Sequence, residues 1–282
     1  MSVNGYFDRL GAKYRARMAM RGTYPHPMMV TLVYTLLTVW LANLLMGYVA
    51  DPFSIAVPYL LDGADLRDVL RYIFTPGRVT AYLLMELLIT LYQWVMQYGY
   101  TAYALGLARR TGPGYRTLLE GFSHLGRALG VSFLTTLFIS LWGVLVMVPG
   151  IVVLSAGAML ESFPLIMFSS FLMFAGSVVP LIVSYRYRLA VYFLLDEPDM
   201  GVLTAIRESK ETMRGRKWQL FVMDLTFLGW VILTVLTLGV VGLWAEPYIW
   251  VTEANFYHWA RWGAFPGEGG QPGGYQSPYQ NL

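Results

Sequence analysis

The feature that most restricts this chain is a series of apolar runs, each long enough to cross a lipid bilayer. A crossing helix needs roughly 20 mainly apolar residues, and such runs occur at 28–50, 81–105, 131–160 and 163–195. Inside hydrocarbon every backbone polar group must be bonded within the chain, so runs of this kind form helices. The composition agrees, because 56% of the 282 residues are hydrophobic and 13% are charged, against about 25% in soluble domains.

Two further runs complete the predicted transmembrane domain, which extends over 28–262. The run at 218–238 is a fifth span, and the shorter, more polar run at 243–259 is a sixth. We therefore predict an all-α, polytopic transmembrane helical bundle of about six spans. The first run is too long for the apolar core of a signal peptide, so we expect it to be retained. The absence of cysteine excludes disulfides and thiolate metal sites.

The basic residues predict how the chain is threaded, since Lys and Arg near span ends stay in the cytoplasm. Five precede the first run, four lie within 106–130, seven within 186–217, and the last is Arg261. Only three lie in the 51–79 loop. This asymmetry predicts an even number of crossings, with both termini in the cytoplasm.

Three amphipathic segments precede the first, third and fifth spans, at 1–27, 115–129 and 199–214. In the first, Leu10 and Tyr14 recur at helical spacing, with Lys13 on the opposite face. Helices of this type lie in the headgroup layer with their cations toward anionic lipid. The residues expected to contact headgroups are Arg9, Lys13, Arg17, Arg116, Arg127, Arg214, Arg216 and Lys217.

Prolines interrupt the third and fourth runs at Pro149 and Pro180. A proline inside a helix removes one backbone donor and favours a kink. Two arrangements fit the segment 150–180: long kinked helices that meet at an outer turn near Glu161, or a re-entrant hairpin between two ordinary spans. Of the two, the long helices are favoured.

Charged residues inside the later spans predict an intramembrane cluster. Asp224, Glu253 and either Arg186 or Arg188 lie at a similar depth from the cytoplasmic ends of their spans. A lone charge at that depth is costly, so such residues pair and face the bundle interior. The cluster either locks three helices together or forms an ion or proton path; alternatively, an arginine snorkels to the headgroups.

A second polar stripe lies on the 81–105 run. Glu86, Gln93, Gln97 and Tyr100 share one helical face, and Glu246 of the sixth run is expected near the same level. Two interpretations remain open, interhelical hydrogen bonding or a wetted groove.

No motif of a soluble enzyme is evident. The three histidines lack ligand spacing, and P-loop, nucleophile-elbow and zincin patterns are missing. We therefore predict no catalytic, cofactor-binding or metal-binding residues, and no nucleic-acid partner because topology accounts for the arginines. The segment 263–282 is rich in Gly and Pro and is expected to be a disordered cytoplasmic tail, with tyrosines available to contact another membrane protein.

The later part of the chain resembles a bacterial family of polytopic membrane proteins known as a domain of unknown function, number 975. The resemblance lies in two blocks, 118–151 and 194–261, whose matching segments are RKW at 216–218, FLGW at 227–230, LTLG at 236–239, PY at 247–248 and ANFY at 254–257. The stretch 150–180 departs from the family pattern and looks like an insertion, and the tail looks like an addition. The resemblance implies a multi-pass protein of the bacterial inner membrane and no activity.

Three functions follow as expectations. The first is a non-catalytic membrane protein, such as a scaffold, assembly factor or accessory subunit that binds lipid or another membrane protein. The alternative is a transporter or permeation protein that uses intramembrane carboxylates. The third is a lipid-modifying enzyme, whose candidate residues are Arg188, Asp224, Glu253 and His258.

Overall fold

The computed structural model describes residues 6–49, 52–63 and 65–267 of the chain. Within these residues every regular element is a helix, which confirms the all-α prediction. The expected disordered tail lies outside the described residues from residue 268 onward. Its first residues are packed, because the Phe265 ring lies 6.1 Å from that of Phe7.

The helices follow one another along the chain with short connections. In order they are α1 (Arg9–Met20), α2 (Pro27–Thr35), α3 (Leu41–Val49), α4 (Pro52–Leu61), α5 (Leu66–Ile73), α6 (Pro76–Ala108), α7 (Glu120–Ser123), α8 (Leu125–Met159), α9 (Phe163–Tyr187), α10 (Ala190–Asp196), α11 (Val202–Thr212), α12 (Lys217–Leu225), α13 (Leu228–Leu236) and α14 (Gly242–Trp262). A π-helical turn, η1 (Leu36–Trp40), joins α2 to α3, and a 3-10 turn, η2 (Tyr115–Leu119), precedes α7.

Four helical stretches are long and apolar enough to cross a membrane: Pro27–Gly47, Pro76–Ala108, Leu125–Met159 and Phe163–Asp196. They coincide with the first four predicted spans and indicate a multi-pass membrane protein. The predicted fifth span corresponds to α12 and α13, which pass the same test only together and are bent by 40°. The predicted sixth, α14, is not among the candidates; its sequence mixes apolar residues with charged, amide and aromatic ones.

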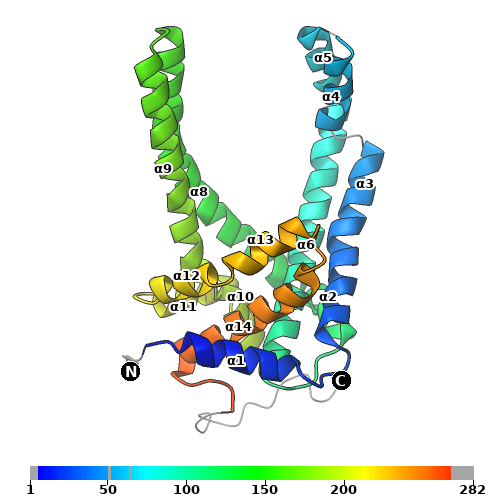
Figure 1. Ribbon diagram of the computed structural model, residues 1–282, viewed down its shortest axis with the longest axis vertical. Coiled ribbons are helices and arrows are strands. Elements are labelled where there is room, and N and C mark those ends of the chain that lie inside the picture. The colour runs from blue at the N-terminus through cyan, green and yellow to red at the C-terminus, as the bar shows by residue number, and fades with distance from the viewer. Residues whose placement is uncertain (1–5, 50–51, 64, 268–282) are drawn as a thin grey trace.

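Two tall helical arms rise from a common base (Figure 1). One arm is the α8–α9 hairpin, and the other is formed by α3 and α6, with α4 and α5 at the far end of α6. The base contains α1, α10, α11 and the end of α14. Between the arms, α12 and α13 run across the molecule, and the end of α13 lies well below the ends of both arms.

The α8–α9 hairpin has the long-helix arrangement that the sequence favoured. Both helices continue through their prolines, Pro149 in α8 and Pro180 in α9. They meet at a turn in which Glu161 has a φ of 47°. The segment 150–180 therefore forms the upper parts of two long helices rather than a short separate hairpin.

The buried core lies in the base rather than in the arms. The C-terminal part of α6 and the C-terminal half of α14 contribute half of its largest side chains, among them Tyr100, Tyr103, Phe256 and Tyr257. The upper parts of α6, α8 and α9 are mostly exposed. A hydrocarbon slab of about 30 Å accounts for exposed apolar arms of this kind.

Helix α1 packs on this core through its alanines, while apolar residues of the predicted interfacial face remain exposed. Ala12, Ala16 and Ala19 are buried, whereas Leu10 and Tyr14 are exposed. The small alanines allow α1 to approach α14 closely, and the Asn255 amide donates a hydrogen bond to the Ala12 carbonyl at 3.0 Å.

The other two predicted interfacial helices have different outcomes. Helix α11 agrees with the segment 199–214, but the segment 115–129 is divided among η2, α7 and the start of α8. The reason is close packing on α6. A Cβ at Gly99 would lie 2.0 Å from the Leu118 carbonyl oxygen, and one at Gly121 would lie 2.0 Å from that of Val95.

Candidate functional site

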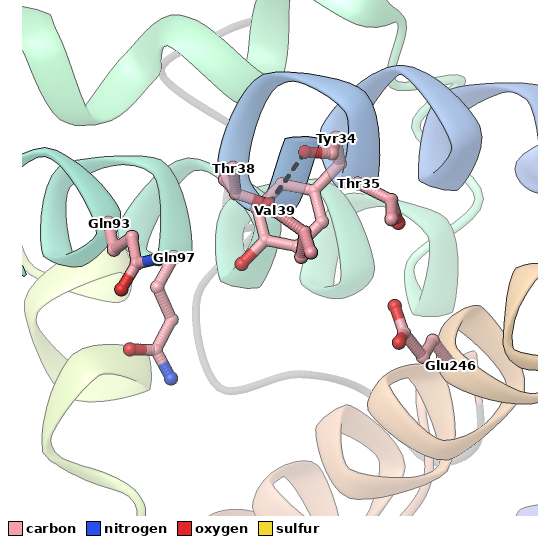
Figure 2. A pocket seen from close by; sticks show the side chains of 7 residues that line it. All are labelled: Tyr34, Thr35, Thr38, Val39, Gln93, Gln97 and Glu246. Atoms are coloured by element: carbon pink, nitrogen blue, oxygen red, sulfur yellow. Dashed lines mark hydrogen bonds between the residues drawn. The ribbon is translucent and has the colours of Figure 1, made fainter. Parts of the chain in front are cut away.

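A polar pocket lies where α2 and η1, α6 and α14 meet. It has a volume of about 240 Å³ and is lined by Tyr34, Thr35, Thr38, Val39, Gln93, Gln97 and Glu246. Figure 2 shows the two glutamines on one side, Tyr34 and Thr38 above, and the Glu246 carboxylate directed toward the gap from below. Four helical elements therefore bring amide, hydroxyl and carboxylate groups around one hollow.

The π-helical turn η1 forms one wall of this pocket. The Thr38 hydroxyl donates to the Tyr34 carbonyl at 2.7 Å, and the Tyr92 hydroxyl donates to the Leu37 carbonyl at 3.1 Å. Side-chain hydroxyls thus donate to backbone carbonyls where the α-helical hydrogen-bond pattern changes to a π-helical one. Single π turns inside α-helices are frequent at functional sites.

Aromatic packing holds the wall in place. The Tyr34 ring stacks on Tyr100 at 4.3 Å between centroids, and Tyr100 meets Trp250 of α14 edge-on at 5.4 Å. The Tyr100 hydroxyl shares a hydrogen bond of 2.8 Å with that of Thr31. These contacts fix α2, α6 and α14 relative to one another.

The predicted polar stripe is only partly assembled here. Gln93, Gln97 and Glu246 line the pocket, Tyr100 stands behind its wall, and Glu86 is exposed on the upper part of α6. Sequence reasoning missed the residues contributed by the first span. The sequence pattern that indicates a polar face on this span is the series Thr31, Thr35 and Thr38, whose hydroxyls recur at helical spacing.

The residues of the predicted intramembrane cluster form two separate contacts. Arg188 donates from Nε to Glu253 Oε1 at 2.9 Å and from Nη2 to Oε2 at 2.8 Å. Asp224 accepts a hydrogen bond of 2.8 Å from the Tyr185 hydroxyl rather than pairing directly with an arginine. Arg186 contributes only its carbonyl, which accepts from the Ser209 hydroxyl at 3.0 Å.

A larger network in the base was not predicted. Asp196 accepts hydrogen bonds from Arg109, from Arg261 at 3.2 Å and from the Tyr257 hydroxyl at 2.6 Å. Arg261 also pairs with Glu197. The sequence signal for this network was the acidic pair Asp196 and Glu197, which directly follows the apolar run at 163–195. We call these residues, with His258, the basal network.

His258 joins the basal network through Arg109. Its Nε2 accepts a hydrogen bond of 2.9 Å from Arg109 Nε. Burial, reinforced by the charges of Arg109 and Arg261, lowers the pKa of His258 to about 2. The ring is therefore neutral at physiological pH, and it belongs to a different network from Asp224 and Glu253. The four candidate residues for a lipid-modifying enzyme are thus divided between two networks, with Arg188, Asp224 and Glu253 in one and His258 in the other.

The residues predicted to contact headgroups also have protein partners in several cases. Arg9, Arg17, Arg116 and Arg214 are exposed, although Arg17 lies 5.3 Å from the Tyr248 ring. Lys13 lies 4.3 Å from the Phe227 ring, and burial together with nearby arginines lowers its pKa.

The remaining three basic residues are partly buried. Arg127 donates to the Leu194 and Glu197 carbonyls at 2.7 and 2.8 Å. Arg216 donates to the Thr212 carbonyl at 2.7 Å, while Lys217 begins α12. Among the residues that the structure describes, no group of three or more His, Cys, Asp or Glu side chains is arranged to hold a metal ion.

Comparison with known proteins gives a family match. A family model described as "Protein of unknown function (DUF975)" matches residues 8–261. No curated protein matches the chain, and no solved structure matches it. The match covers the stretch 150–180 as well as both blocks that carry the sequence resemblance. The chain belongs to the DUF975 family.

Proposed function

We propose that this chain is a non-catalytic accessory or scaffold protein that holds another membrane protein against its α8–α9 hairpin. The observation that carries the proposal is the exposed apolar surface of this arm. We define the hairpin surface by its exposed apolar side chains at helical spacing, which are Leu141, Leu145, Val148 and Val152 of α8 and Phe171, Phe174, Val178 and Ile182 of α9.

The two helices of the arm pack tightly on each other, which leaves their outer faces free. A Cβ at Gly176 would lie 2.9 Å from Val146 Cγ1, and one at Gly157 would lie 3.0 Å from Leu165 Cβ. Small residues at such positions let membrane helices approach closely. The arm therefore has its own interface, so its outer faces are not needed to hold the hairpin together.

The outer faces remain uncovered along most of the arm. In the most apolar 18-residue stretch of α8, 6% of the residues are buried. Phe171 and Phe174 are 68% and 74% exposed. Lipid accounts for the apolar character of the arm, but rigid aromatic rings are favoured at protein interfaces, and two of them lie close together here. Together these properties support a protein partner in the membrane.

The membrane arrangement that we propose follows the basic residues. The base carries most of them, so it lies on the cytoplasmic side of the bacterial inner membrane, with both chain termini. The α12–α14 segment begins and ends at the base, and its tip lies well below the ends of the arms (Figure 1). We take this segment to enter the membrane and return, which keeps the number of crossings even.

Site-specific photocrosslinking in native membranes tests the proposed function. A crosslinking residue at Phe171 or Phe174 is expected to capture one discrete protein. The matched control is Val235, which is 71% exposed on α13 outside the hairpin surface, and it should not capture that protein. If all three positions yield only lipid adducts, the partner role is wrong.

The polar pocket supports a second candidate, a permeation protein. The pocket places a carboxylate and two amides among spans that are otherwise apolar, as a substrate site in a transporter would. Purified protein in liposomes tests this candidate: flux of a small cation that Glu246→Gln abolishes would favour transport over the accessory role.

A further inference from the structure

Glu246 is a half-buried carboxylate that lines the polar pocket. It lies on α14 between Ala245 and Pro247, both of which are buried. Within the described part of the chain, its carboxylate has no hydrogen-bond or ion-pair partner. The side chain is partly buried, and an unpaired charge is costly to the extent that it is removed from water, so a counter-charge that enters the pocket would bind favourably.

The other lining groups match the donors of a primary ammonium. Such a group has three N–H donors and no acceptor. The carboxylate of Glu246, the amide oxygens of Gln93 and Gln97 and the hydroxyl oxygen of Thr35 all accept hydrogen bonds, and all four residues line the same hollow (Figure 2). These acceptors come from three different helical elements, so they can surround one ligand group.

The remaining wall suits the carbon atoms next to such a nitrogen. Val39 and the Tyr34 ring line the pocket, and Tyr100 stacks on Tyr34 at 4.3 Å. An aromatic ring held in place attracts a cation by its quadrupole. One carboxylate, several neutral acceptors and an apolar wall favour a singly charged organic cation.

The size of the pocket distinguishes an organic cation from a bare metal ion. A metal ion needs oxygen ligands that converge to roughly 2.0–2.6 Å from one point. The hollow has a volume of about 240 Å³ and holds a single carboxylate, so it is wider than an ion cage and carries little charge. It has room for an ammonium group together with a short carbon chain.

We propose that the polar pocket binds a small primary ammonium group, with Glu246 as its counter-charge. Two sources supply this chemistry, a soluble alkylamine and the headgroup of an aminophospholipid that reaches the pocket from the lipid. The proposal concerns a surface separate from the α8–α9 hairpin, so it stands or falls independently of the proposed partner role.

Thermal unfolding in nanodiscs tests the proposal. Wild-type protein is placed in phosphatidylcholine and phosphatidylglycerol, which contain no primary amine, and titrated with ethanolamine against KCl at equal ionic strength. We expect a saturable rise of about 3 °C at ten times the dissociation constant for ethanolamine and none for KCl.

Exchange of phosphatidylcholine for phosphatidylethanolamine then distinguishes the sources. Stabilisation by the lipid itself, with little further effect of ethanolamine, identifies the headgroup. An unchanged melting temperature with a retained ethanolamine effect identifies a soluble amine. If neither amine stabilises the protein, or if KCl does so equally, the proposal is overturned.

Variants localise the effect to the pocket. Glu246→Gln is expected to abolish the stabilisation, and Thr35→Val is expected to move the ethanolamine midpoint to higher concentration while the protein remains folded. Glu86→Gln is the matched control, because Glu86 is an exposed carboxylate on α6 outside the pocket; it should retain the full effect. Full stabilisation of both pocket variants would place the amine elsewhere and refute the assignment.

Discussion

Arg188 and Glu253 form a two-point ion pair, at 2.9 and 2.8 Å, between the end of α9 and the middle of α14. The Glu253 side chain is 5% exposed and that of Arg188 is 41% exposed. The pair therefore joins one arm to the base through a buried carboxylate whose partner remains partly accessible. Removal of Arg188 would leave a buried, unpaired carboxylate, whereas removal of Glu253 would leave an arginine that water can reach.

Arg188→Leu is expected to destabilise the protein by about 3 kcal/mol, because it leaves the buried Glu253 charge unpaired. The double variant Arg188→Leu with Glu253→Leu should lose less than the sum of the single variants. Unfolding in mild detergent by heat or denaturant measures the cycle. Arg214→Leu is the control, since Arg214 is exposed. Strictly additive losses would show that the pair is not coupled.

Asp224→Asn is expected to have a small effect, a loss of about 1 kcal/mol or less. The Tyr185 hydroxyl can donate to an amide oxygen as well as to the carboxylate that it contacts at 2.8 Å. Tyr185→Phe should cost a similar amount, and the two changes together little more than either alone. A loss for Asp224→Asn as large as that for Arg188→Leu would instead show direct dependence on arginine.

The lowered pKa of His258 predicts a pH dependence of stability. Above about pH 6.5 the ring is neutral in both the folded and the unfolded states, so it contributes no dependence. Below that pH the unfolded chain binds a proton, whereas the folded chain does not until about pH 2. Stability should therefore fall on acidification, with a contribution of up to about 1.4 kcal/mol per pH unit.

Melting temperatures of the wild type and of His258→Asn, measured from about pH 7 to about pH 5, isolate this contribution. The variant keeps an acceptor for Arg109 but has no imidazole, so its curve should be flatter over this range. Parallel curves would assign the acid sensitivity to other groups.

The close approach of α8 and α9 predicts a site-specific response to larger side chains. Gly157→Leu and Gly176→Leu should each destabilise the arm by about 1–3 kcal/mol, because their Cβ atoms would lie 3.0 Å and 2.9 Å from the facing helix. Gly126→Leu is the control on the same helix, since nothing lies within 4 Å of its added Cβ. Equal effects at all three positions, measured by thermal unfolding, would contradict the observed interface.

The proposed membrane arrangement is testable because the chain has no cysteine. A single cysteine at Glu161, in the turn of the α8–α9 arm, should react with an impermeant maleimide added outside intact cells. A cysteine at Leu238, in the turn after α13, should not, although Leu238 is 96% exposed in the structure. Labelling of both positions from outside would show that α12 to α14 crosses the whole membrane.

The sequence by itself determined the helical class and the first four candidate spans. A continuous apolar run of about 20 residues satisfies its backbone in hydrocarbon as a helix, so local composition is enough. It also indicated which polar residues lie within the runs, including Gln93, Gln97 and Glu246. The buried face of α1 could not be read in this way, because apolarity favours Leu10 and Tyr14, whereas close packing on α14 requires alanines.

Only the tertiary structure decided which polar residues meet. The partner of Glu253 is Arg188 rather than Arg186, and that of Asp224 is Tyr185, since rotation of each helix about its axis selects among neighbours that have equal depth. The polar pocket likewise needed Thr35 and Thr38 from the first span. Contacts between segments far apart in the chain depend on how helices cross, and that geometry is set by packing of the whole base.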